Sequence, residues 1–393
     1  MTPCDTRPIV DWLVDGARSA ADTEGVLAEL CERLAGCGMP LSRAALFVHT
    51  LHPQVMGIRF LWKPGEAVEV DRAPFEAFEA EDFRHSPVRH VIDTGVALRR
   101  RLADASCRLD SAVVRDLRAA GATDYLAVPL RFADGTVRCA TFTTEAPGGF
   151  RDAQVAGLQA IVAPLARVVE NQTLRYTAST LLDTYVGAHA GQRVFAGQIR
   201  RGQTTTIDAA IWLSDMRHFT RFADRLPPQA LIDLLNRYFD CQVPGIVGRG
   251  GEVLKFVGDG LLAIFAIAPG GDDVREVCGA ALDAAHEARR AVLAAFGDAP
   301  ALVEEGPRFG LALHLGQVLY GNIGSGNRLD FTCIGPAVNL AARLEKLSGG
   351  LGRTIVASEE FARHLPASRL VRVGDFALPG FAAPRAVFGL DDE

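Results

Sequence analysis

The chain has 393 residues, of which 49% are hydrophobic, and this is enough material for two domains with apolar cores. The formal net charge of −6 argues against the basic surface of a general nucleic-acid-binding protein. No apolar run reaches the roughly 18–20 residues that a membrane-spanning helix needs, and aspartates interrupt the N-terminal segment where a signal peptide would be apolar. None of the eight cysteines has Cys-x-x-Cys spacing, so no structural zinc site is predicted. We expect a cytoplasmic protein with no membrane span and no nucleic-acid partner.

The region 1–150 combines one helical pattern with several strand-like runs. Apolar residues at helical spacing predict a helix within 16–37, and the turn signal Ala133-Asp134-Gly135 predicts a hairpin. A helix beside an antiparallel sheet is an α+β module. The order and length of these elements resemble a GAF-type sensory domain, and the PAS fold is the nearest alternative. The predicted strands are 44–49, 58–62, 125–132 and 137–143.

The region 151–206 is predicted to be a linker helix followed by a connector. Its apolar residues recur at spacings of three and four, which indicates a short coiled-coil seam within a helix that continues to about Tyr185. Such a helix could carry a signal and form a dimer contact, or it could simply pack on the first domain. Residues 187–206 are polar and contain glycine, which is typical of a connector. The seam residues are Leu158, Ile161, Leu165 and Val168.

The region 207–393 is predicted to be a second α+β domain. Its runs follow the order β-α-β-β-α-β of a ferredoxin-like core with additions. Pro228 opens the first helix, because proline is tolerated at a first helical position. The predicted strands are 209–213, 253–257, 261–265, 309–315, 354–357 and 370–376, and the later helices are 277–295 and 338–347.

Two aspartates lie where predicted strands of this domain end. Asp215 follows an apolar strand, and Asp259 stands between two glycines at the tip of a predicted hairpin. Glycine permits unusual backbone angles and a close approach of a ligand. Mg²⁺ binds one or two carboxylates together with substrate phosphates, so the pair indicates a site for hard cations. Each aspartate alone would also fit a structural turn.

A third segment places an amide and a guanidinium on one helical face. Asn339 and Arg343 are four residues apart on a predicted helix, so their side chains share a face and could hold a ribose and a phosphate. Together, SDMRHFT, EVLKFVGDG and FTCIGPAVNLAAR resemble the catalytic domain of class III adenylate/guanylate cyclases. The resemblance covers about 207–390.

The resemblance implies a role for each matching residue. Asp215 and Asp259 would bind two Mg²⁺ or Mn²⁺ ions, and Lys255 with Thr332 would select adenine rather than guanine. Asn339 would orient the ribose, and Arg343 would stabilise the transition state. The backbone of a loop would face the phosphates, and the residues matching this loop are Met216, Phe219 and Thr220.

The implied reaction is attack of the ribose 3′-oxygen of ATP on its α-phosphate, which yields cyclic AMP and pyrophosphate. The family arrangement implies a homodimer, with the aspartates from one copy and the remaining groups from the other. The first domain would regulate this activity. Its ligand would be a small molecule or an ion, or the domain would serve only as a dimerisation module.

Two departures leave alternatives open. Pro379 stands where the family often has a phosphate-binding lysine, and Arg353 or Arg328 could replace that contact. This departure keeps a catalytically silent nucleotide-binding regulator as an alternative, and a guanylate cyclase is another. Gly250-Gly251-Glu252 is similar to the signature of diguanylate cyclases, but here the hairpin tip is 257–260.

Overall fold

The computed structural model describes residues 5–268, 270, 273–296 and 308–391. The chain separates into two compact units, Met1–Leu181 and Leu182–Glu393, and the division falls within helix α7 (Asp152–Val186). Each unit has its own sheet and its own apolar core. Within the described ranges, no helix is both long and apolar enough to cross a membrane.

The N-terminal unit is built on a six-stranded antiparallel sheet in the order β3-β2-β1-β6-β5-β4. The predicted hairpin is confirmed, because β5 and β6 pair in register around the turn at 133–135. Strands β3 and β4 were not predicted. The strands are β1 (Arg43–His49), β2 (Gly57–Trp62), β3 (Glu69–Ala73), β4 (Leu98–Arg100), β5 (Asp124–Arg131) and β6 (Val137–Thr144).

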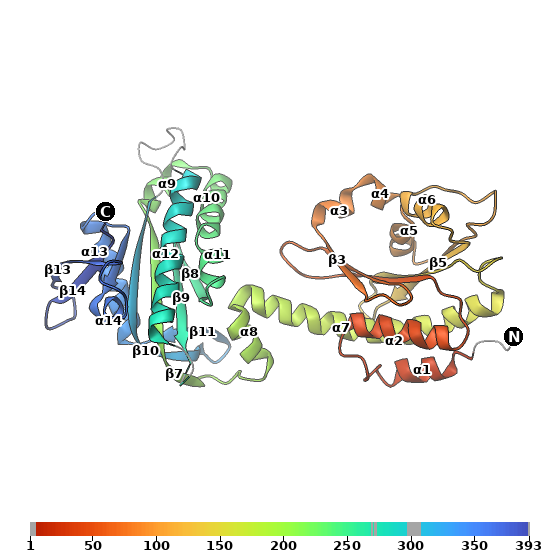
Figure 1. Cartoon of the computed structure of the whole chain (residues 1–393), viewed down its shortest axis with the longest axis horizontal. Helices are drawn as coiled ribbons and strands as arrows, with labels where there is room; N and C mark the ends of the chain where they lie inside the picture. The colour runs from red at the N-terminus through yellow and green to blue at the C-terminus, as the bar shows by residue number, and fades with distance from the viewer. Residues whose placement is uncertain (1–4, 269, 271–272, 297–307, 392–393) are drawn as a thin grey trace. The chain divides into compact units, whose positions relative to one another are not determined.

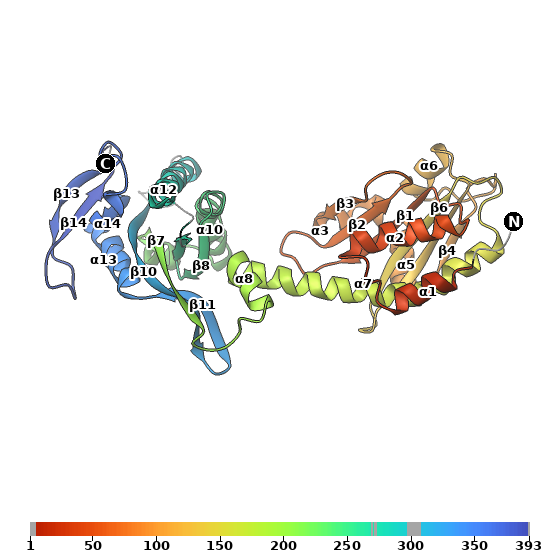
Figure 2. The same cartoon turned by 60° about the horizontal axis from the view of Figure 1, so that its bottom comes forward.

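Helices cover both faces of this sheet (Figures 1 and 2). Buried residues of α1, α2 and α7 form one cluster with β1, β2, β5 and β6. Buried residues of α5 and α6 form a second cluster with Tyr125 and Cys139. The helices before α7 are α1 (Arg7–Val14), α2 (Thr23–Gly36), α3 (Phe75–Glu79), α4 (Glu81–Arg84), α5 (Pro87–Thr94) and α6 (Ala112–Ala119).

The C-terminal unit contains an eight-stranded sheet in the order β13-β14-β12-β10-β7-β9-β8, with β11 paired to β10. Its central elements follow the predicted order β-α-β-β-α-β, from β7 through α10, β8, β9 and α12 to β10. The strands are β7 (Thr204–Arg217), β8 (Glu252–Val257), β9 (Gly260–Ile267), β10 (Arg308–Ser325), β11 (Arg328–Ile334), β12 (Ile355–Ser358), β13 (Val371–Phe376) and β14 (Arg385–Gly389).

The two faces of this sheet carry different helices. Alternate residues of β7 show the division, because Trp212 is in one core cluster with α10 and α12, whereas Ile211 is in another with α8 and α13. The helices are α8 (Ala188–Phe195), α9 (Phe219–Arg225), α10 (Pro228–Asp240), α11 (Val243–Val247), α12 (Val274–Phe296), α13 (Pro336–Gly350) and α14 (Glu359–Ala362).

The connector predicted over 187–206 is partly wrong. Residues Ala188–Phe195 form helix α8, and β7 already begins at Thr204. The segment has a polar composition because α8 buries only Ala190 and Gly191. Short, glycine-bearing helices of this kind give little apolar periodicity in the sequence.

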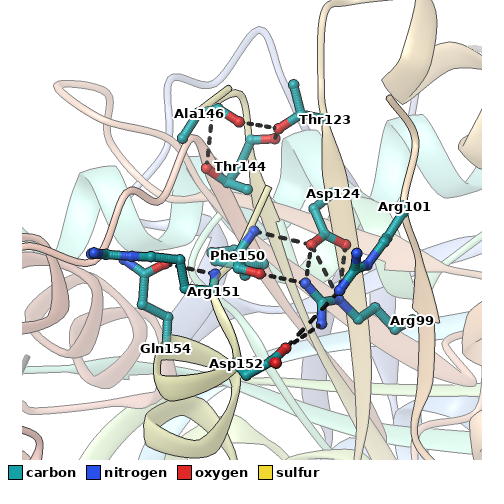
Figure 3. A network of polar contacts seen from close by, with 10 residues as sticks. All are labelled: Arg99, Arg101, Thr123, Asp124, Thr144, Ala146, Phe150, Arg151, Asp152 and Gln154. Atoms are coloured by element: carbon teal, nitrogen blue, oxygen red, sulfur yellow. Dashed lines mark hydrogen bonds and ion pairs between the residues drawn. The ribbon is translucent and has the colours of Figure 1, made fainter. Parts of the chain in front are cut away.

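The start of α7 is fixed by a buried carboxylate (Figure 3). The side chain of Asp124 is fully buried, and its Oδ2 lies 2.6 Å from Nη2 of Arg99. The same oxygen accepts a hydrogen bond of 3.0 Å from the backbone N–H of Phe150, two residues before α7 begins. Arg99 also donates to the carbonyl of Phe150. The network therefore joins β4 and β5 to the residue that leads into α7.

We predict that Asp124→Ala lowers the free energy of unfolding by about 3 kcal/mol, because it leaves Arg99 and the Phe150 amide without their buried partner. Urea unfolding of the full chain measures this loss. Asp93→Ala is the matched control, since Asp93 pairs with Arg89 on the surface and both side chains are more than two-fifths exposed. The control should cost less than about 1 kcal/mol. Equal losses in the two variants would contradict the role given to Asp124.

Candidate functional site

The two aspartates predicted to bind metal lie side by side in the C-terminal unit. Asp215 is in β7 and pairs in register with Gly260, the residue that follows Asp259. The two carboxyl groups are close enough for the charge of Asp259 to act on Asp215. Gly260 makes this proximity possible, because a Cβ there would lie 3.0 Å from the carbonyl oxygen of Ser214 and 3.2 Å from Oδ1 of Asp215.

The charge around this pair is strongly negative. Partial burial, followed by the nearby charges of Asp259 and Glu345, raises the pKa of Asp215 to about 7. A divalent cation bound between the two carboxylates would relieve this repulsion. Within the described residues, no group of three or more His, Cys, Asp or Glu is arranged to hold a metal ion. Two adjacent carboxylates are a donor set that would suit Mg²⁺ or Mn²⁺, because these ions complete their coordination with water and phosphate oxygens.

Lys255 and Thr332 lie on two strands in contact, β8 and β11. The positive charge of Lys255 interacts electrostatically with the thiol of Cys333, the residue next to Thr332. Thr332 is 3% exposed, and within the described residues its Oγ1 has no hydrogen-bond partner. A buried hydroxyl without a partner costs about 1–3 kcal/mol, so this group is suited to a polar ligand.

Asn339 and Arg343 share the exposed face of α13. Within the described part of the chain, neither side chain has a hydrogen bond or an ion pair. Glu345 is 5% exposed and lies about 160° around the helix from Arg343, because successive helical residues are about 100° apart. The buried face of α13 therefore points toward Asp215 and Asp259 of the same chain, while Arg343 points away from them.

The predicted phosphate loop lies after β7. The side chain of Met216 is buried in the core, so that only its backbone could face a ligand. His218 has φ of 61°, and this left-handed residue turns the chain into α9, whose first residues are Phe219 and Thr220. The substitutes suggested for Pro379 differ in availability. Arg353 donates to the carbonyl of Leu390 and is held in the sheet, whereas Arg328 is exposed at the start of β11.

Arg217 and Glu345 were not assigned from the sequence, although both lie within two residues of a predicted site residue. Nη1 of Arg217 lies 2.9 Å from Oε1 of Glu345, and this contact is an ion pair in which Oε1 accepts no hydrogen bond. Nη2 of Arg217 donates to the backbone carbonyl of Glu345 at 3.1 Å and to the hydroxyl of Ser348. The strand that carries Asp215 is thus joined to the helix that carries Arg343.

Comparison of the whole chain with known proteins finds a family match. Residues 203–388 match the family described as the adenylate and guanylate cyclase catalytic domain. The matched residues lie within the C-terminal unit. An adenylate cyclase of Anabaena cylindrica is 33% identical over 173 residues, which are 42% of this chain and 32% of that protein. Adenylate cyclase 1 of Rhizobium meliloti is 31% identical over 147 residues, which are 37% of this chain and 21% of that protein.

The matched segment spans about a third or less of the length of these two curated relatives. Among solved structures, the adenylyl cyclase CyaB of P. aeruginosa is similar with 28% identity and a TM-score of 0.43. That similarity covers 49% of this chain and 97% of the CyaB chain.

We predict that Gly310→Ala destabilises the C-terminal unit by about 3 kcal/mol. A Cβ at Gly310 would lie 1.6 Å from Nη2 of Arg217, so the guanidinium must leave and Glu345 becomes a buried charge without a partner. Gly279→Ala in α12 is the matched control, because a Cβ there meets nothing within 4 Å, and its unfolding free energy should not fall. Thermal and urea unfolding measure both variants, and a Gly310→Ala protein as stable as the wild type would contradict the role of Arg217.

Proposed function

We propose that this chain is an adenylate cyclase that converts ATP to 3′,5′-cyclic AMP and pyrophosphate at the interface of a homodimer. The observation that carries the proposal is the buried hydroxyl of Thr332, which has no hydrogen-bond partner among the described residues and lies on a strand next to that of Lys255. Adenine N1 accepts a hydrogen bond, and the ammonium of Lys255 only donates. The adenine N6 amine donates, and the hydroxyl of Thr332 can accept. Guanine presents a donor at N1 and would oppose Lys255.

The second copy of the chain is needed because of the way α13 is oriented. Arg343 and Asn339 lie on the face of α13 that turns away from the aspartates of their own chain. A symmetric dimer would bring these side chains to the aspartates of the other copy and form two equal sites. Each site would then take its carboxylates from one copy and its base-reading, ribose-orienting and phosphate-stabilising groups from the other.

The residues of the chain would act mainly by positioning and by electrostatics. Asn339 would hold the ribose so that its 3′-oxygen faces the α-phosphate, and Arg343 would stabilise the negative charge that develops on that phosphate. Asp215 and Asp259 would hold two divalent ions, which supply charge neutralisation for the triphosphate and activation of the ribose hydroxyl. The turn at His218 and the first residues of α9 would direct backbone amides toward the phosphates.

We predict that the purified chain forms cyclic AMP from ATP with Mg²⁺ or Mn²⁺, and that Arg343→Ala lowers kcat by about 10²–10³, as expected for the loss of one preorganised donor. Arg343 is exposed, so the variant should unfold at the wild-type temperature. Arg290→Ala, at an exposed position of α12, is the control and should keep the wild-type rate. Cyclic GMP from GTP as the main product would indicate a guanylate cyclase. No cyclic nucleotide at all would indicate a silent regulator.

We further propose that the N-terminal unit contains a GAF-like domain over 1–150. This domain would regulate the activity of the catalytic region 207–393 through the linker 151–206. Its six-stranded antiparallel sheet with helices on both faces supports the assignment. A cavity of about 660 Å³ lies over the sheet, and its walls include Phe47 and Leu61.

Arg43 makes this cavity suited to an organic anion. It lines the cavity and is partly buried, and within the described residues it has no hydrogen bond or ion pair. Burial, and then the nearby charge of Arg59, lowers the pKa of Arg43, as expected for a cation without a counter-charge. Asp82, Asp116 and Glu145 also line the cavity. Among the described lining residues, Arg43 is a cation without a partner, and beside apolar residues such as Leu61 it would favour an amphipathic anion as the regulatory ligand.

We predict that the full chain binds the amphipathic anion 1-anilinonaphthalene-8-sulfonate in this cavity and that Arg43→Gln weakens binding about tenfold, as for the loss of one charged hydrogen bond. Fluorescence titration measures the affinity. Arg108→Gln is the control, since Arg108 is exposed and does not line the cavity. Equal affinity in the two variants would contradict the ligand assigned to the cavity.

A further inference from the structure

Glu252 is a buried carboxylate that the proposed chemistry does not use. It is the first residue of β8 and is 9% exposed. Its Oε1 accepts a hydrogen bond of 3.1 Å from the backbone N–H of Ala190, in the first turn of α8. Its Oε2 accepts a hydrogen bond of 2.6 Å from the hydroxyl of Tyr320 in β10. One side chain thus joins a helix and two strands of the C-terminal unit.

The helix end that Glu252 holds has no cap of its own. The residue before α8 is Gly187, which has no side chain that could satisfy the free amides of the first turn. The carboxylate of Glu252 supplies the missing acceptor, and its negative charge is favourable at a helix N-terminus. Gly187 has φ of 95°, and a Cβ there would lie 3.2 Å from the carbonyl oxygen of Val253. The joint between α7 and α8 therefore lies directly against β8.

The strand residue that Glu252 holds lies beside the proposed purine site. Tyr320 pairs in register with Cys333, and its ring packs edge-on against Phe331 with centroids 4.9 Å apart. Thr332 lies between Phe331 and Cys333 in the sequence of β11. The guanidinium of Arg193, in α8, lies 5.1 Å from the centre of the Tyr320 ring. Helix α8 thus contacts the Tyr320 ring, which packs against Phe331, the residue that precedes Thr332 in β11.

The other proposed purine reader lies on the strand that begins at Glu252. Lys255 follows three residues later, after a register shift in β8 between Val253 and Lys255. The N-terminal end of β8 is fixed to α8 and β10 through Glu252. A displacement of the α7–α8 joint would therefore move the strands of both purine readers together. Hydrogen bonds to a base weaken steeply with small changes in distance and angle.

We propose that Glu252 and Tyr320 are positioning residues for purine recognition, and that they join the α7–α8 joint to Lys255 and Thr332. This inference rests on the proposed function, because it assigns the residues that hold the base-reading pair. It also gives the end of α7 a direct route to substrate affinity. Neither residue needs to touch the nucleotide.

The test compares Glu252→Gln and Tyr320→Phe in the full chain. We expect each to raise the KM for ATP about fivefold and to lower the ratio of kcat/KM for ATP over GTP, because a hydrogen bond that positions the readers is lost. Since neither residue acts on the phosphates, kcat at saturating ATP should stay within about twofold of the wild type. Gly187→Ala, which disturbs only the joint, should raise the KM in the same direction.

Glu287→Gln is the matched control, because Glu287 of α12 also accepts a hydrogen bond, from Arg249, but contacts neither α8 nor the purine strands. It should keep the wild-type KM and purine ratio. Circular dichroism checks whether Glu252→Gln folds. If it does not, Tyr320→Phe alone tests the positioning role, because it removes one hydroxyl and keeps the packed ring.

Wild-type KM and purine ratio in the folded variants would overturn the inference while leaving the proposed function intact. If the wild type converts neither ATP nor GTP, the proposed function fails instead. The affinity for a fluorescent N-methylanthraniloyl ATP then tests positioning alone. An unchanged Kd in the variants, relative to Glu287→Gln, would overturn it.

Discussion

The proposed mechanism depends on the orientation of one helix. The buried face of α13 carries Glu345 toward the aspartate pair, and its exposed face carries Asn339 and Arg343. A side chain cannot reach both directions from a rigid helix, so in the proposed mechanism a single chain would hold only part of a catalytic site. Dimerisation would then be a geometric requirement of the chemistry, and any signal that changes the contact between two copies would change the rate.

Buried carboxylates recur at the points that fix this geometry. Asp124 holds the start of α7, Glu252 holds the joint between α7 and α8, and Glu345 holds α13 to β7 through Arg217. A buried charge is costly without a partner, so each of these contacts favours one arrangement of its elements over nearby alternatives. This specificity suits a protein whose proposed site residues must meet those of a second copy.

The sequence predicted much of the fold because its strands are strongly patterned. The Gly258-Asp259-Gly260 turn and the apolar runs beside it located the β8–β9 hairpin, and the hairpin in turn placed Asp259 at its tip. Helix α8 and strand β4 could not be found, since short elements with few buried residues give no clear periodicity.

The contacts that support the site could not be predicted from the sequence either. Arg217 and Ser348 are 131 residues apart in the chain, and only the packing of α13 on the sheet brings them together. Thr332 could be chosen from its motif, but only the folded structure shows that its buried hydroxyl has no hydrogen-bond partner in the described ranges.

The most direct test of the central claim is complementation between two inactive variants. Copies carrying Asp215→Asn and copies carrying Arg343→Ala would be co-expressed with different affinity tags, and mixed dimers would be isolated by two successive purifications. A site shared between copies predicts that the mixed dimer recovers about half of the wild-type cyclic AMP production, because one of its two sites has every group intact. A mixed dimer as inactive as the parent variants would contradict the shared site.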